Sequence, residues 1–170
     1  MPFTDVFRRV GAAYSAGDQR PLRGYLATLG SYGALVAGAT AVGRRAGVRL
    51  PDRVALGDVV LMSLATHKAS RLLTKGAVTS VLRAPFTRYD EPAGAAEVNE
   101  SVRGDDTRHA VGELVTCPFC SGVWIASALT AGLVFAPRAT RLAATTLSVV
   151  AVSDWLHFVH SGLKHRVSDH

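Results

Sequence analysis

Two long runs of uncharged residues constrain this chain more than any other feature of its sequence. Residues 24–43 hold 20 residues without a formal charge, and residues 114–135 hold 22. About 20 apolar residues, each rising about 1.5 Å along a helix, cross a hydrocarbon core of about 30 Å. Both runs are therefore typical of membrane-spanning helices. We expect the first to act as an uncleaved signal-anchor, since the residues before it do not resemble a cleavable signal peptide.

Two weaker apolar segments complete the predicted membrane domain. Residues 54–73 and 140–163 are long enough to cross a bilayer, although the first contains Asp58, Lys68 and Arg71. Long cationic side chains near a helix end can reach the interface, so these charges are compatible with a span. The sequence therefore predicts an all-α fold, a four-span transmembrane helical bundle over residues 24–163. Residues 74–112 form its one long polar loop.

The residues before the bundle are predicted to form an amphipathic helix. Phe3, Val6, Phe7 and Val10 recur at the spacing of one helix face, with Arg8 and Arg9 elsewhere on the circumference. A basic amphipathic helix next to a span is typical of the headgroup interface, although packing in the cytosol is an alternative. We therefore assign residues 1–23 to an interfacial segment and residues 164–170 to a C-terminal tail.

The basic charge of the chain favours a membrane location. Its formal net charge is +6, but no aromatic-rich basic strand and no zinc-finger spacing supports nucleic-acid binding. Membrane lipid is therefore the expected partner. With four spans, thirteen Lys and Arg fall on the side of the termini and the long loop, against six on the other side. This bias predicts a multi-pass protein of the bacterial cell membrane with both termini in the cytoplasm.

The sharpest chemical motif is Cys117-Pro118-Phe119-Cys120, at the start of the second uncharged run. Two thiols at this spacing can chelate a metal ion or close into a disulfide, and a helix N-terminus favours the reactive thiolate. A tetrahedral zinc or iron site would need two further ligands. The candidates are the histidines expected near the same end of the bundle: His67, His109, His157 and His160. A redox pair, a metal site and a purely structural pair of thiols all remain open.

One acidic residue lies inside the predicted fourth span. Asp154 is costly in lipid unless it is paired or hydrated. Lys68 and Arg71 on the predicted second span lie at similar depth, so we expect one of them to form an ion pair with Asp154. A proton or ion path through Asp154 is the alternative.

Three stretches carry a resemblance to a known family. They are Thr66–Leu73 (THKASRLL), Val81–Tyr89 (VLRAPFTRY) and Glu113–Trp124 (ELVTCPFCSGVW). Together they resemble the bacterial family called domain of unknown function 1360, which includes a sporulation protein. The resemblance implies a small integral membrane protein, and it implies no activity. It also marks six candidate functional residues: His67, Arg71, Arg83, Arg88, Cys117 and Cys120.

The sequence thus predicts an uncharacterised bacterial integral membrane protein with a metal or thiol-redox site at the C-P-F-C motif. The alternative is a non-enzymatic membrane scaffold whose loop at residues 74–112 docks a protein partner, because long ordered loops are commonly functional. The sequence does not determine whether the chain is an enzyme or what its oligomeric state is.

Overall fold

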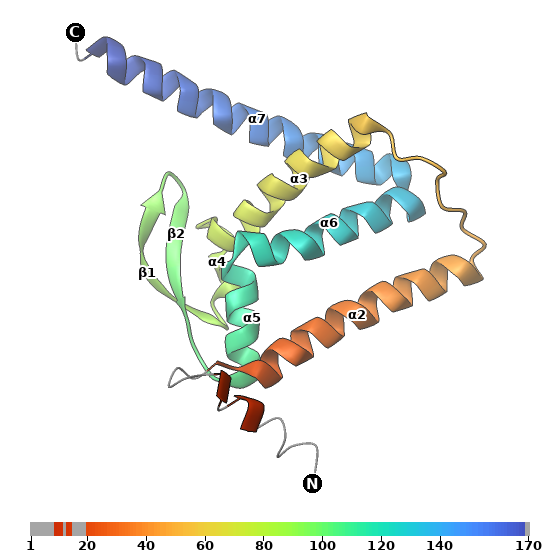
Figure 1. The fold of residues 1–170 in the computed structure, drawn as a ribbon. Coiled ribbons are helices and arrows are strands. Elements are labelled where there is room, and N and C mark those ends of the chain that lie inside the picture. The colour runs from red at the N-terminus through yellow and green to blue at the C-terminus, as the bar shows by residue number, and fades with distance from the viewer. Residues whose placement is uncertain (1–8, 12, 15–19, 169–170) are drawn as a thin grey trace.

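The computed structural model describes residues 9–11, 13–14 and 20–168, and most of these residues are helical. The long helices α2, α3 and α6 run in similar directions and α7 crosses α3, while the shorter elements gather at the end where α3 finishes and α6 begins (Figure 1). In chain order the elements are α2 (Leu22–Arg45), α3 (Leu56–Lys75), α4 (Ser80–Arg83), β1 (Thr87–Gly94), β2 (Glu97–Val102), α5 (Asp106–Thr116), α6 (Pro118–Phe135) and α7 (Pro137–Ser168).

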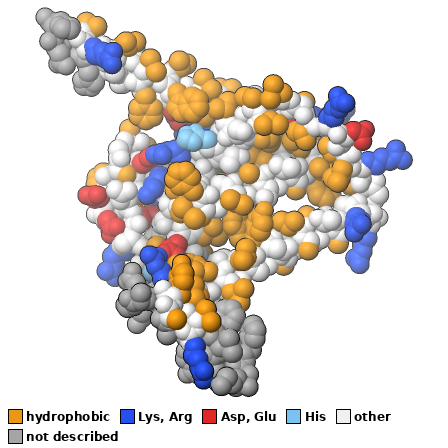
Figure 2. All heavy atoms as spheres, in the orientation of Figure 1, with side chains coloured by type: hydrophobic (Ala, Val, Ile, Leu, Met, Phe, Trp, Pro, Cys, Tyr) orange, Lys and Arg blue, Asp and Glu red, His pale blue; other side chains and the backbone are white. Residues whose placement is uncertain are grey.

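Three of these helices are long and apolar enough to cross a membrane: α2, α6 and the stretch Pro137–Lys164 of α7. Their apolar side chains point outward, since only 6% of the most apolar window of α2 and of α6 is buried, and 17% of that of α7. Figure 2 shows hydrophobic side chains spread over the long helices rather than hidden between them. An apolar surface of this extent is typical of a protein that lies in lipid.

Helix α3 packs against both α6 and α7 and forms the centre of the bundle. Its residues Met62 and Ala65 are buried with Ala144 of α7, next to Leu129 and Leu133 of α6. Ser148 of α7 donates a hydrogen bond to the Leu61 carbonyl at 2.8 Å. Small residues at these crossings let the helices approach closely, which favours association in lipid.

Two ion pairs join α3 to α7, one toward each end of α3. Arg141 donates two hydrogen bonds to the Asp58 carboxylate, each 2.8 Å long. Lys68 Nζ lies 2.5 Å from Asp154 Oδ2. Nine uncharged residues separate Asp58 from Lys68, so both pairs bracket the most apolar part of α3. Charged groups inside or near a bilayer are tolerated when they are paired in this way.

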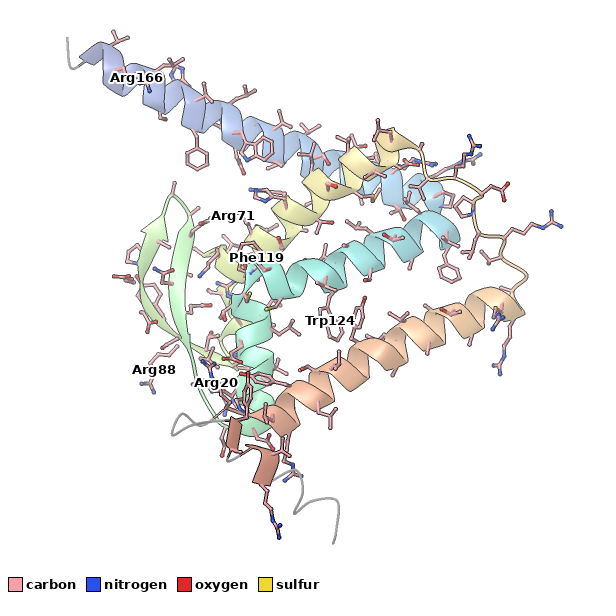
Figure 3. The ribbon with its side chains drawn as sticks, viewed as in Figure 1. Arg20, Arg71, Arg88, Phe119, Trp124 and Arg166 are labelled. Atoms are coloured by element: carbon pink, nitrogen blue, oxygen red, sulfur yellow. The ribbon has the colours of Figure 1, made fainter. Side chains whose placement is uncertain are left out.

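Helix α2 touches the rest of the protein at three places along its length. Near its start Gly24 lies against α5, where any added Cβ would collide with the backbone at Asp106. At mid-height the Tyr32 hydroxyl lies 2.8 Å from Ser127 Oγ, and the Tyr32 ring meets the Trp124 ring edge-on at 5.2 Å between centroids. Figure 3 shows Trp124 reaching from α6 toward α2. At the far end Gly43 lies against the Phe135 ring.

The prediction of an all-α fold with one long loop is wrong for residues 74–112. This region contains the short helix α4, an antiparallel hairpin of β1 and β2, and the first part of α5. The register pairs Thr87 with Val102 and Tyr89 with Glu100, and irregularities follow Tyr89 and Pro92. The turn uses positive φ angles at Gly94 (141°) and Ala96 (61°), a conformation that glycine adopts easily. An isolated hairpin is marginal in water, so contacts with the helices must hold it in place.

The predicted helix that covers the second uncharged run is broken in the structure. Cys117 is extended (φ −99°, ψ 111°) and separates α5 from α6, which begins at Pro118. Proline disfavours helical dihedrals in the residue before it, while its own missing N–H is no loss at a helix start. The chain therefore turns sharply at Cys117, so that α6 points along the bundle and α5 lies across its end (Figure 1).

The predicted N-terminal amphipathic helix is described only in part. Residues 9–11 and 13–14 are helical, whereas Phe3, Val6 and Phe7 lie outside the described residues. At the other end of the chain, α7 continues without a break past Leu163 to Ser168.

We predict that Lys68 and Asp154 are stable only as a pair. Replacing Lys68 with Met leaves the Asp154 carboxylate uncompensated, and the expected loss of stability is about 1.5–3 kcal/mol. The double change Lys68→Met, Asp154→Leu should recover most of that loss, because no charge is then left without a partner. Thermal unfolding in detergent or nanodiscs measures both. A double variant no more stable than Lys68→Met would contradict the prediction.

Candidate functional site

The shorter elements form a compact polar cap, defined here as residues 76–116, at one end of the bundle. Helix α3 ends at Lys75, and the chain turns at Gly76 into α4. Gly76 pairs with Glu97 as an isolated β-bridge, and the Ala77 N–H donates to the Ala96 carbonyl at 2.9 Å. The end of α3 is therefore continuous with the hairpin.

Arg83 is the centre of the cap, and its side chain is completely buried. Its Nε donates to Glu100 Oε2 on β2 at 2.5 Å. One terminal nitrogen donates to the Leu73 carbonyl at 2.6 Å and to Thr79 Oγ1 at 2.9 Å. The other donates to the Gly76 carbonyl at 3.0 Å. The guanidinium thus satisfies carbonyls that the end of α3 leaves unpaired, where the helix dipole also favours a cation.

Two further arginines hold the turn between α4 and β1. Arg103 donates to the Ala84 carbonyl at 2.8 Å. Arg108 donates through Nε to the Pro85 carbonyl at 2.9 Å, and its terminal nitrogen bonds the same oxygen. Because these bonds reach back to the turn from the residue after β2 and from α5, the cap is fixed by contacts between segments about 20 residues apart in the chain.

A second ion pair fastens the hairpin to α3. Arg71 donates through two nitrogens to the Glu97 carboxylate, at 3.1 and 2.5 Å. Lys68 and Arg71 were the two alternatives predicted for the partner of Asp154. The structure pairs Lys68 with Asp154, while Arg71 pairs with Glu97 of the cap. The sequence could not separate the two, because Glu97 was assigned to a loop.

The two cysteines lie where the cap meets α6. Cys117 is the N-cap residue of α6, and its Sγ accepts the Cys120 N–H at 3.3 Å. The Ser121 hydroxyl donates to the Cys117 carbonyl at 3.0 Å. Both cysteines are free thiols, Cys117 half-buried and Cys120 exposed. Phe119 between them is 87% exposed and projects from the start of α6 (Figure 3).

Opposing effects act on the Cys117 thiol, and the lowering ones prevail. Partial burial raises the pKa, but hydrogen bonds from the side chain and N–H of Cys120 and from the N–H of Phe119 lower it, with help from the positive charge of Lys75. The net result is a Cys117 pKa below its ordinary value. A helix N-terminus acts in the same direction. Cys117 therefore forms a thiolate more readily than Cys120, which donates hydrogen bonds to it through its N–H and its side chain.

The four histidines proposed as metal ligands do not gather around the thiols. His67 contacts Trp155 in a tilted arrangement, with ring centroids 5.8 Å apart and an angle of 57° between the ring planes. His109 Nε2 lies 3.5 Å from Glu113 Oε1, while His157 and His160 are exposed on α7. Within the described part of the chain, no three His, Cys, Asp or Glu side chains lie close enough to hold a metal ion. The residues present do not fit a zinc or iron centre, so we derive no chemistry from one.

The remaining candidates have separate places. Arg88 lies on the exposed strand β1, at the outer side of the hairpin (Figure 3). Four residues that hold the cap together are not predicted from the sequence: Thr79, Glu100, Arg103 and Arg108. The sequence signal for these residues was weak. An arginine that follows an apolar helix predicts a contact with the end of that helix only if the chain is known to fold back onto it.

Comparison with known proteins identifies what the chain resembles. A family model described as protein of unknown function (DUF1360) matches residues 61–160. The sporulation protein YjcA of Bacillus subtilis (strain 168) is 30% identical over 109 residues, which cover 58% of this chain and 92% of that protein. No solved structure matches. The matched region contains Arg83, the thiols and the Lys68–Asp154 pair, while α2 and the connection at residues 46–55 precede it.

We predict that Arg83 holds the cap on the bundle. Changing Arg83 to Met removes a cation from a buried ion pair and leaves the Glu100 carboxylate and the Leu73 carbonyl without their hydrogen-bond donor, which should cost about 3–5 kcal/mol. Limited proteolysis should then cleave residues 84–105, which resist cleavage in the unchanged protein. Arg88→Met is the matched control, since its exposed side chain bonds to none of the residues that the structure describes. Equal protease resistance in all three proteins would contradict the role.

We also predict that Cys117 reacts at lower pH than an ordinary thiol. Because its pKa is lowered, the thiolate persists below the usual midpoint of about 8.5. The rate of alkylation by iodoacetamide, followed by mass spectrometry of the Cys117 peptide, should reach half its maximum below that pH. A midpoint at or above 8.5 would show that burial outweighs the hydrogen bonds.

Proposed function

This chain belongs to the family described as protein of unknown function (DUF1360), and from that premise we propose that it is a four-span bacterial membrane protein carrying a thiol–disulfide exchange site. The site consists of Cys117 and Cys120, where α6 meets the polar cap. The name of its relative connects that protein with sporulation but describes no chemistry. The proposal therefore rests on the thiols and their surroundings.

Helix α3 is the proposed fourth span. Its charges alone would exclude it from lipid, but Asp58 and Lys68 are neutralised by partners on α7, and Arg71 is neutralised by Glu97. With α3 as the fourth crossing, the number of crossings is even, and both termini lie on one side of the membrane. The excess of Lys and Arg on that side favours a cytoplasmic cap, so we propose that the thiols face the cytoplasm and rest in the reduced state.

One observation carries the thiol proposal: the Cys120 N–H points at Cys117 Sγ from 3.3 Å, with Cys117 at the N-cap of an 18-residue helix. This geometry stabilises a thiolate on Cys117 and keeps a second thiol one helical turn away to resolve a mixed disulfide. The exposed ring of Phe119 leaves an apolar contact for a protein substrate beside both sulfurs.

The proposed reaction transfers two electrons to a disulfide on another protein. The Cys117 thiolate attacks one sulfur of that disulfide, forms a mixed disulfide and releases the other sulfur as a thiolate. Cys120 then gives up its proton and attacks Cys117 Sγ. This step closes the Cys117–Cys120 disulfide and releases the second substrate thiolate. The two cysteines lose two electrons, and the substrate gains them. Cys120 supplies one of the two protons that the substrate thiolates take up, and the solvent supplies the other, because Cys117 reacts as a thiolate.

A second function, docking of a protein partner by the cap, is favoured by the rigid attachment of the hairpin. Arg83 and Arg71 fix β2 to α3, whereas every residue of β1 after Thr87 is exposed. The cap would then be a preformed binding module on a membrane anchor. A partner that co-purifies equally with the unchanged protein and with a Cys117→Ser, Cys120→Ser variant would favour this function over thiol exchange.

We predict that Cys120→Ser traps substrates as mixed disulfides. With the resolving thiol removed, the intermediate on Cys117 should accumulate and appear as additional bands on a non-reducing gel that vanish with reductant. Cys117→Ser is the matched control and should trap little, since the thiol it keeps lies outside the N-cap position. Trapping by both single variants alike, or by neither, would rule out the exchange reaction.

A further inference from the structure

The opposite end of the bundle carries a cluster of arginines that the dithiol proposal does not use. Where α2 and α6 end and α3 and α7 begin, there are six arginines and two aspartates. Arg141 pairs with Asp58. The other five arginines are exposed and bond to none of the residues that the structure describes: Arg44, Arg45, Arg49, Arg53 and Arg138. Figure 2 shows Lys and Arg side chains gathered at this end.

The cations of the polar cap are used differently. Arg83 is buried, Arg71 pairs with Glu97, and Arg103 and Arg108 bond to backbone carbonyls. Carboxylates and backbone carbonyls of the protein thus bind most of the cationic side chains at that end. The five exposed arginines at the opposite end lack such partners within the described chain, so their charge is directed outward.

The connection at residues 46–55 adds a second, independent observation. Apolar residues alternate with its arginines and are largely uncovered: Leu50 is 76% exposed, Val54 58% and, at the start of α3, Leu56 78%. Exposure of these apolar side chains to water would be unfavourable. At the boundary between acyl chains and headgroups, apolar side chains enter the hydrocarbon while arginines extend to the phosphates.

We propose that residues 44–56 together with Arg138 form a binding surface for anionic phospholipids. The surface continues the lipid-facing sides of α2 and α3, so its occupant is the headgroup layer of the same bilayer. Arginine suits this ligand because its planar guanidinium donates two parallel hydrogen bonds to a phosphate. The inference rests on the membrane location proposed above and is independent of the thiol chemistry.

The test compares two pairs of exposed arginines that have no partner among the described residues. The full-length protein is placed in nanodiscs of mixed phosphatidylglycerol and phosphatidylethanolamine, and the lipids that stay bound after mild detergent treatment are counted by native mass spectrometry. Arg49→Gln, Arg53→Gln should lower the preference for phosphatidylglycerol by roughly twenty-five-fold, about five-fold for each charge near the surface. The matched control, Arg88→Gln, Arg166→Gln, should leave that preference unchanged.

Two further measurements keep the inference open to contradiction. Inorganic phosphate at millimolar concentration should not displace the lipid; displacement would mean that the ligand is a free anion. A tryptophan introduced as Leu50→Trp should be quenched by lipids brominated on their acyl chains, beyond the quenching of Trp124 and Trp155 in the unchanged protein. An equal loss of preference in both arginine pairs, or an unquenched residue 50, would overturn the proposal.

Discussion

Contact between outward apolar side chains and hydrocarbon is the constraint on which this architecture depends. The hydrophobic residues buried within the described chain are Met62, Ala65, Ala110, Ala144 and Ala151, of which four are alanines. Burial of so little apolar volume cannot offset the conformational entropy of four long helices in water. In lipid the requirement changes: the helices are covered by the solvent itself, and small residues and paired charges then decide how they pack. The ion pairs of α3 with α7 are paired charges of this kind.

The cap follows the opposite rule, because polar contacts organise it. The guanidinium of Arg83 joins the last carbonyls of α3 to Glu100 on β2, and the hairpin and α5 are arranged around that junction. Pro118 then forces the turn that leaves Cys117 extended at the head of α6. The position of the thiols is therefore a consequence of how the cap is attached to the membrane helices.

Much of the membrane part could be predicted from the sequence, while the cap could not. Long uncharged runs reveal α2 and α6 directly, and the cost of a charge in lipid brought Lys68 and Asp154 forward as partners, which the structure places 2.5 Å apart. The hairpin escaped prediction because Pro92, Gly94 and several acidic residues weaken its strand signal, and its support comes from Arg71 and Arg83 far away in sequence. The four candidate histidines do not gather around the thiols for a related reason. The position of a residue along a spanning helix predicts its depth in the membrane, but it does not predict the direction in which its side chain points.

Extraction of the full-length protein from bacterial membranes tests the central claim most directly. After an alkaline carbonate wash, which releases peripheral proteins, the account predicts that the chain stays in the membrane pellet and enters solution only with detergent. Recovery of a folded, monomeric protein in detergent-free buffer would contradict it. The outward faces of α2, α6 and α7 would then need a covering other than lipid.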